Sequence, residues 1–348
     1  MSKLKAGIIG AGQIAETVHI ANYQKYPEEV EVTAIVDTIP EKARAIAEKY
    51  NIPYYFSSAK KMFEALDLDI ASICTPNKFH YENVMLALKN NCNVFCEKPP
   101  GIKAKEALEM LNLSKEKNKV LAYNFHHRHS TDVEYMKKSM DSGQLGDIYY
   151  GRIKALRRRG IPGWGVFTNK ELQGGGPLID LGVHMLDAAL YLAGFPKIKS
   201  VSAFSYTKIG NVKNKGTLGE WNPEKFQVED FLTGYIKFEN SSVWNLETSF
   251  ALNIKEKNTI MNVELFGTEG GMNLADMEIY TEANGELTDI KKAALAAEDK
   301  QEKSVRDFIN VCKGDKNALI TNAEEGYEIQ RLVEALYTSA ETGKEIEL

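Results

Sequence analysis

Two stretches of the sequence carry side chains that could move a proton and stabilise negative charge on an oxygen. Residues 174–187 read GGGPLIDLGVHMLD, with Asp180 and His184 four positions apart. On a helix this spacing puts both side chains on one face, one turn apart. Imidazole ordinarily has a pKa of about 6.5, which suits a general base near neutral pH. The other interpretation is an acid–histidine pair on a helix surface.

The second stretch is EKPP, residues 97–100, at the end of a short apolar run. Prolines stiffen the backbone after Lys98, so its position is well defined. A lysine held there can donate to an oxygen on which negative charge develops. A solvated Lys–Glu pair is the alternative. TPN, residues 75–77, follows the preceding apolar run in the same way.

The first third of the chain alternates apolar runs with amphipathic segments, which predicts a parallel sheet covered by helices on both faces. The right-handed crossover rule makes this a doubly wound Rossmann domain. The predicted strands are residues 3–10, 29–37, 68–76, 92–100 and 119–125, and the predicted helices are 13–26, 40–50, 57–66, 79–91 and 104–118.

The turn after the first predicted strand reads GAGQIA, residues 10–15. Gly10 permits a tight turn, Gly12 lets a pyrophosphate approach the backbone, and Ala15 keeps helix and strand close. Asp37 ends the second predicted strand, where an acid can accept the ribose hydroxyls of NAD and repel the 2′-phosphate of NADP. Two alternatives remain: a Rossmann-like domain that binds no phosphate, and Asp37 as a helix N-cap, a role compatible with ribose binding.

After residue 124 the pattern changes to longer alternating segments joined by polar turns, which predicts a mostly antiparallel, open-faced sheet in an α+β domain. A helix over 178–193 interrupts it, and helices over about 301–313 and 322–341 end the chain. Residues 209–224 are polar and glycine-rich, so we expect a surface loop. We therefore predict a Rossmann NAD-binding domain over 1–124 and a substrate-binding and oligomerisation domain over 125–348.

Composition excludes some functions. The 348 residues carry 43% hydrophobic and 26% charged residues and a net charge of −5. An acidic chain argues against nucleic acid as the main partner. No run reaches the roughly 20 apolar residues of a membrane span, and the N-terminus resembles no export signal, so we expect no membrane partner and a cytoplasmic location. The cysteines form no CxxC pair, and we expect reduced, mainly structural thiols.

The ordered set GIIGAGQIA, CTPNKFH, EKPPG, GQLGDI and GGGPLIDLGVHMLD resembles the Gfo/Idh/MocA oxidoreductases over nearly the whole chain. The resemblance implies a nicotinamide cofactor between a Rossmann domain and an open-faced sheet, with sugar-like or cyclitol substrates. It implies Lys98, Asp180 and His184 as catalytic residues. It also implies a set of cofactor contacts: Gly10, Gly12, Gln13, Ile14, Asp37, Thr75, Asn77, His80, Glu97, Lys98 and Asn124.

Two stretches depart from the family pattern or are particular to this chain. The family's usual arginine beside the "YN" strand end is absent, and the chain instead reads FHHRH, residues 125–129. We expect one of these histidines, His126, to line the substrate pocket and the others to be solvated. Further ligands for a metal are not evident nearby, so we predict none.

The stretch RRRGIPGWG, residues 157–165, could grip substrate. On a strand, Arg157 and Arg159 would share a face and bind hydroxyls or a carboxylate; surface charge or a subunit contact is the alternative. Trp164 could cover a sugar or the nicotinamide, or anchor packing. The expected substrate contacts are Lys98, His126, Arg157, Arg159, Trp164, Asp180 and His184.

These observations predict an NAD-dependent dehydrogenase or reductase of a sugar, cyclitol or sugar acid, which self-associates as a dimer or tetramer through the C-terminal sheet. His184 would take the hydroxyl proton, Lys98 would stabilise the reacting oxygen, and Asp180 would orient substrate and tune the imidazole. A glycoside-cleaving enzyme with a retained cofactor and a non-catalytic NAD-binding regulator are the alternatives.

Overall fold

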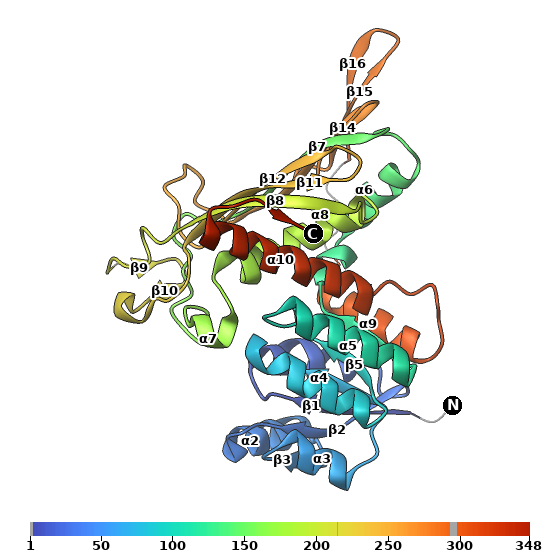
Figure 1. Cartoon of the computed structure of the whole chain (residues 1–348). Helices are drawn as coiled ribbons and strands as arrows, with labels where there is room; N and C mark the ends of the chain where they lie inside the picture. Colours follow the sequence, from blue (N-terminus) through green and yellow to red (C-terminus); the bar gives the residue numbers. More distant parts are fainter. Residues whose placement is uncertain (1–2, 214, 293–297) are drawn as a thin grey trace. The chain divides into compact units, whose positions relative to one another are not determined.

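The computed structural model describes residues 3–213, 215–292 and 298–348 (Figure 1). The chain divides into two compact units. The first contains Met1–His126 and Asp299–Gln330, and the second contains His127–Glu298 and Arg331–Leu348. Each unit has its own sheet.

The first unit is built on a sheet whose described strands run in the order β17-β6-β5-β4-β1-β2-β3. The pairings among β1 to β6 are parallel, and this is the order of a Rossmann fold. The predicted doubly wound sheet is therefore confirmed. The strands are β1 Leu4–Ile9, β2 Val30–Val36, β3 Tyr54–Phe56, β4 Ile70–Ile73, β5 Asn93–Cys96, β6 Leu121–Tyr123 and β17 Thr321–Asn322.

Helices follow these strands as the apolar spacing predicts. The first helix begins as a π-helical turn, Ala15–Ile20, and continues as α1, Ala21–Tyr23. The others are α2 Pro40–Tyr50, α3 Ala59–Ala65, α4 His80–Lys89 and α5 Ala104–Lys117. Pro40 starts α2 at a position where its missing N–H costs nothing, and Ser58 caps α3 by accepting from the Lys61 amide.

The domain boundary differs from the expected one, because Asp299–Gln330 returns to the first unit. Helix α9, Lys300–Cys312, places Phe308 against Phe95 of β5 with ring centroids 4.7 Å apart. Strand β17 pairs antiparallel with β6. These apolar and backbone contacts bind the segment to the first sheet, so the expected second domain of 125–348 is interrupted.

The second unit is built on a sheet whose described strands run in the order β16-β15-β14-β13-β7-β12-β11-β8-β18. Its pairings are antiparallel except that of β12 with β7, which confirms the predicted mostly antiparallel sheet. The strands are β7 Ile148–Leu156, β8 Ile198–Tyr206, β11 Phe231–Phe238, β12 Val243–Ser249, β13 Ile260–Gly267, β14 Gly270–Asn273, β15 Glu278–Ala283, β16 Glu286–Lys291 and β18 Ile346–Glu347.

Helix α8, Val183–Leu192, packs against strands β7 and β13 of this sheet. A π-helical turn, Leu178–Gly182, precedes it. The remaining helices are α6 Thr131–Asp141, α7 Lys170–Gln173 and α10 Ala323–Thr342, which begins in the first unit and ends in the second. Every described residue of α8 except Tyr191 is buried, so this helix forms part of the core of the unit.

The predicted surface loop 209–224 is more ordered than expected. It contains the short hairpin β9 Lys215–Gly216 and β10 Gly219–Glu220. Trp221 is buried, and its indole N–H donates to the Gly210 carbonyl at 2.8 Å. An aromatic anchor thus fixes a segment whose composition is otherwise typical of a loop.

The cysteines are free thiols, and burial raises the pKa of Cys92 and of Cys312 to about 12. Such thiols stay protonated at neutral pH, which agrees with the expected structural role. Among the described residues, we find no helix with the length and apolar character needed to span a bilayer.

Candidate functional site

The first glycine loop joins β1 to the π-helical turn at Ala15. Gly10 has a φ of +102°, and a Cβ at this position would lie 2.7 Å from the Cys74 carbonyl oxygen. Only glycine fits there. Around Gly12 the opposite holds, since a Cβ would meet nothing within 4 Å. The open space beside a helix N-terminus fits a dinucleotide phosphate.

Asp37 at the end of β2 holds this loop in place. One carboxylate oxygen accepts from the Ala11 amide at 3.0 Å, and the other accepts from the Ile39 amide at 2.9 Å. The side chain remains partly exposed. Asp37 therefore anchors the first glycine loop and the start of α2. Each oxygen of its carboxylate retains a lone pair that a ribose hydroxyl could use.

The EKPP segment is fixed by the buried carboxylate of Glu97. One oxygen accepts from His19 Nε2 at 2.9 Å and from Asn124 Nδ2 at 2.8 Å. Burial alone would raise the pKa of Glu97, but the hydrogen bonds and nearby positive charge lower it below its usual value. The neighbouring Lys98 is partly exposed. Glu97 thus anchors the backbone that carries Lys98.

Two of the expected cofactor contacts, His80 and Asn124, have internal hydrogen-bond partners. His80 is fully buried, and its ring nitrogens lie 2.7 Å from the Pro99 carbonyl and 2.9 Å from the Thr75 carbonyl. Burial lowers its pKa, although both carbonyls oppose this. Asn124 is also fully buried and accepts from the Ser304 hydroxyl at 2.9 Å. Internal partners occupy both side chains, and their contact with a cofactor stays a prediction.

The other expected cofactor contacts lie at the carboxyl ends of β1 and β4. Gln13 is exposed, Ile14 and Thr75 are partly buried, and Asn77 is buried. The parallel pairing of β1 and β4 brings these strand ends to one edge of the sheet. Their contact with a cofactor stays a prediction.

The second glycine loop, residues 174–176, is held by close packing within its own unit. A Cβ on Gly175 would lie 2.0 Å from Tyr337 Oη, and a Cβ on Gly176 would lie 2.3 Å from the Glu229 carbonyl oxygen. Glu229 accepts from the Gly176 amide at 2.9 Å and from the Tyr337 hydroxyl at 2.8 Å. Burial raises the pKa of Glu229, and these hydrogen bonds oppose the shift.

Asp180 and His184 follow this loop and are both buried. Asp180 lies in the π-helical turn and His184 in the first turn of α8, so the regular helix assumed for their spacing begins only at Val183. A π-helical turn is wider than an α-helical one and often occurs at functional sites. Burial lowers the pKa of Arg157, and the charge of Asp180 opposes the shift.

A fully buried ion pair lies one turn beyond His184. The Arg128 guanidinium donates to both carboxylate oxygens of Asp187, at 2.7 to 3.1 Å, and both side chains have no exposed surface. The rings of Tyr191 and Phe195 lie 4.8 and 5.3 Å from the guanidinium carbon. Removing one partner from such a pair typically costs about 3–5 kcal/mol.

The prediction that His129 is solvated is therefore wrong. Both Arg128 and His129 are buried, because the pairing of Arg128 with Asp187 draws this segment onto α8. His127 lies beside His184, with ring centroids 5.1 Å apart, and is partly exposed. A ring nitrogen of His127 lies within 4.8 Å of one of His184. Its position beside His184 was not expected from the sequence. His126 is partly buried, and its contact with substrate stays a prediction.

Arg157 and Arg159 do not share a strand face, because β7 ends at Leu156. Arg157 is partly buried and donates to the Gly160 carbonyl at 3.2 Å. Arg159 donates to Asn253 Oδ1 at 2.6 Å. Trp164 is 52% exposed, so it is not a core anchor. Arg157 therefore remains a candidate near Asp180, whereas Arg159 is committed to the 252–253 segment.

The supporting side chains that the sequence left unidentified pair across long distances along the chain. Arg128 and Asp187 are 59 positions apart, and Tyr337 and Glu229 are 108 apart. The available signal was the residue type alone, since a charged side chain amid apolar neighbours, such as Asp187 in α8, must find a partner.

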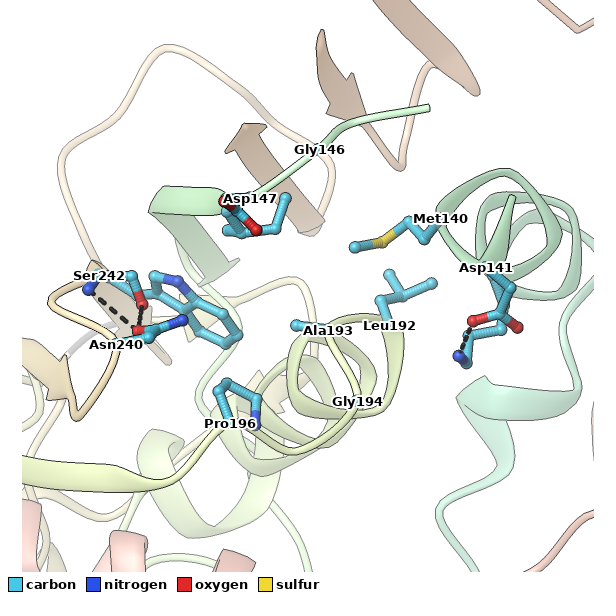
Figure 2. A pocket seen from close by; sticks show the side chains of 13 residues that line it. Met140, Asp141, Gly146, Asp147, Leu192, Ala193, Gly194, Pro196, Asn240 and Ser242 are labelled. Carbon is cyan, nitrogen blue, oxygen red and sulfur yellow. Dashed lines mark hydrogen bonds and ion pairs between the residues drawn. The ribbon is translucent and has the colours of Figure 1, made fainter. Parts of the chain in front are cut away.

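A separate cavity of about 250 Å³ lies between the ends of α6 and α8 and the turn that joins β11 to β12 (Figure 2). Its lining includes Met140, Asp147, Leu192 and Asn240. None of the predicted site residues lines it, so it does not belong to the candidate site.

Comparisons with known proteins extend over both units. The family model "Oxidoreductase family, NAD-binding Rossmann fold" matches residues 4–125, and "Oxidoreductase family, C-terminal alpha/beta domain" matches residues 137–348. The chain is 48% identical to D-glucoside 3-dehydrogenase of Escherichia coli (strain K12) over 347 residues, covering 100% of this chain and 98% of that protein.

A more distant relative and two solved structures also resemble this chain over most of its length. Levoglucosan dehydrogenase of Pseudarthrobacter phenanthrenivorans is 26% identical over 78% of this chain and 73% of that protein. A solved levoglucosan dehydrogenase structure with NADH and L-sorbose superposes with a TM-score of 0.83 at 22% identity, covering 100% of this chain and 99% of that one. An oxidoreductase domain protein from Kribbella flavida gives a TM-score of 0.86 at 19% identity, with coverage of 100% and 99%. The chain therefore belongs to the Gfo/Idh/MocA oxidoreductase family.

Proposed function

We propose that this oxidoreductase is an NAD-dependent dehydrogenase that oxidises a secondary hydroxyl of a sugar derivative, with D-glucosides as the first substrate class and C3 as the reacting carbon. The observation that carries this proposal is the 48% identity to a D-glucoside 3-dehydrogenase across the whole chain. The reverse reduction of the corresponding carbonyl is part of the same proposal.

The first unit offers residues that fit NAD. The open space at Gly12 would admit the pyrophosphate, and Asp37 would accept the adenosine ribose hydroxyls. NAD, when bound, supplies the acceptor for the hydride that leaves the substrate carbon. We infer NAD rather than NADP, because the Asp37 charge would repel a 2′-phosphate.

The chain's own residues would handle the substrate oxygen and its proton. His184 would take the hydroxyl proton as general base. Lys98 would donate to the reacting oxygen and stabilise the negative charge that develops on it. Asp180 would orient the substrate and tune the imidazole, with Arg157 near enough to feel its charge. His126 and Trp164 would contact the sugar.

Substitution of these residues tests the proposal. His184→Ala should lower kcat by about 10²–10⁴-fold, the usual range for a general acid–base group. Lys98→Met should lower kcat by a similar factor. In the double variant the two reductions in kcat should not multiply, because both groups serve one step. NAD binding, followed by fluorescence, should change little in the His184 variant. The exposed Lys138 of α6 provides a matched control, Lys138→Met, with wild-type turnover. Near-wild-type turnover in either single variant would remove that residue from the mechanism.

We also propose that copies of the chain associate through the open face of the second sheet. This face carries Phe204, Tyr206 and Tyr235, which are 42–59% exposed. Exposed aromatic clusters of this kind favour protein contacts. Light scattering of the purified protein would test this association by measuring the mass of the particle in solution. The cytoplasm remains the expected compartment.

A further inference from the structure

We propose that His127 is a proton relay for His184: it carries the substrate proton from the buried catalytic imidazole to bulk water. This inference rests on the proposed function, because it takes His184 as the general base. It assigns a role to a side chain for which the sequence indicated none.

The need for a relay follows from burial. His184 is only 7% exposed, so little of its imidazole is in direct contact with bulk water. Each oxidation deposits one proton on the imidazole, and the next turnover requires the neutral ring. A neighbouring base with access to water would restore that state.

His127 meets this requirement by position and chemistry. Its ring lies 5.1 Å from that of His184, centroid to centroid, at an interplanar angle of 56°. A nitrogen of one ring lies within 4.8 Å of a nitrogen of the other, a separation that a single water molecule can bridge with two hydrogen bonds. His127 is partly exposed, whereas His184 is buried. The pair therefore forms a path from the interior to the surface.

The buried ion pair gives this path a fixed geometry. Asp187 lies three residues after His184 on α8, and Arg128 directly follows His127 in the chain. The pairing of Arg128 with Asp187, at 2.7 Å without solvent exposure, docks the 127–128 segment along one face of α8. Tyr191, four residues after Asp187, packs against the guanidinium on the same face. Arg128 and Asp187 are thus positioning residues for the two imidazoles.

One proton moves from the substrate hydroxyl to bulk water along this path. The substrate O–H bond breaks, and its proton binds a ring nitrogen of His184. A bridging water accepts that proton while passing one of its own to a ring nitrogen of His127. His127 then releases a proton to bulk water, and both rings return to their neutral forms.

Two variants of the whole protein test the relay. His127→Phe keeps a flat ring against His184, and His127→Gln keeps hydrogen-bonding capacity, but neither carries a proton at neutral pH. In weakly buffered solution, each should lower kcat by roughly tenfold, less than loss of the general base itself. Added imidazole or another small diffusible base should restore most of the lost rate, and wild-type turnover should not respond. Melting temperature and NADH binding by fluorescence should match the wild type.

The outcomes separate this inference from the proposed function. If His184→Ala loses turnover while both His127 variants turn over normally in weak buffer, the relay is wrong and the proposed function stands. If the His127 variants are slow but gain nothing from added base, His127 shapes the site and carries no proton. A stoichiometric transition metal in the purified protein, lost in His127→Phe, would also overturn the relay. Normal turnover in His184→Ala would remove the proposed function itself.

Discussion

Two glycine loops precede π-helical turns in this molecule, one in each unit, and Gly12 of the first and Gly176 of the second lie in different surroundings. Around Gly12 a side chain would meet open space, whereas around Gly176 it would meet the Glu229 backbone. The first loop keeps room for a ligand. The second lets a segment pack tightly, and that packing fixes the start of the helix that carries His184.

The packing around Gly176 bears on the role of the three glycines at residues 174–176. Three glycines before a candidate catalytic helix are typical of a loop that passes close to cofactor and substrate without side chains in the way. The structure gives a reason inside the second unit: Tyr337 and Glu229 fill the space next to Gly175 and Gly176. A glycine-rich loop before a candidate catalytic helix therefore indicates close approach, but whether of a ligand or of the protein itself depends on the fold.

The largest expected effect that separates the two loops is on stability. Gly176→Ala would bring a methyl group against the Glu229 carbonyl oxygen, a backbone atom, and should lower the free energy of unfolding by about 1–3 kcal/mol. Gly12→Ala is the matched control: it should leave the melting temperature unchanged and weaken NADH binding. Thermal unfolding and NADH fluorescence titration measure both. Equal melting temperatures for the two variants would contradict the proposed difference between open space at Gly12 and close packing at Gly176.

Coenzyme choice tests the first loop, because Asp37 anchors this loop and is the proposed partner of the adenosine ribose. Repulsion of a 2′-phosphate should favour NAD over NADP by about 1–3 kcal/mol, or roughly tenfold to a hundredfold in kcat/KM. Arg44 is a poor compensating partner, since it already pairs with Glu48 at 2.7 Å. Asp37→Asn should reduce the ratio of kcat/KM with NAD to kcat/KM with NADP. Equal kcat/KM with NADP in the wild type would contradict this account of Asp37.

The smallest expected effect concerns the support of the second loop. Tyr337→Phe keeps the ring but removes the hydroxyl that donates to Glu229 and accepts from the Ile179 amide. Stability should fall by about 1 kcal/mol, the usual contribution of a hydrogen bond. kcat should fall modestly, with NADH affinity unchanged, because the loop precedes Asp180 and His184. A change in NADH affinity with constant kcat would assign Tyr337 to the cofactor site instead.

Much of the fold was predictable because its signals are local. Apolar runs identified the parallel strands of the first unit, and the turn after β1 identified the phosphate loop. Strand β3, Tyr54–Phe56, was missed because it is only three residues long and mostly exposed. The return of α9 and β17 to the first unit was missed because an amphipathic pattern does not say which core it covers.

The candidate site was less predictable, because its supports join distant parts of the chain. The motifs identified Lys98, Asp180 and His184, yet nothing near residue 128 indicates that Asp187 will pair with it. The internal partners of His80 and Asn124 were missed for a related reason: polar residues at strand ends can bind a ligand or bind the neighbouring loops, and the sequence pattern is the same.

We propose that this chain oxidises a sugar hydroxyl with NAD through Lys98 and His184. The most direct measurement incubates the protein with NAD and a panel of D-glucosides, sugars and cyclitols, follows absorbance at about 340 nm, and identifies the product by mass spectrometry. We expect NADH formation and a keto product two mass units lighter than the substrate with at least one D-glucoside, both abolished in Lys98→Met. Glycoside cleavage without net NADH, or no turnover of any substrate by a protein that binds NAD, would contradict it.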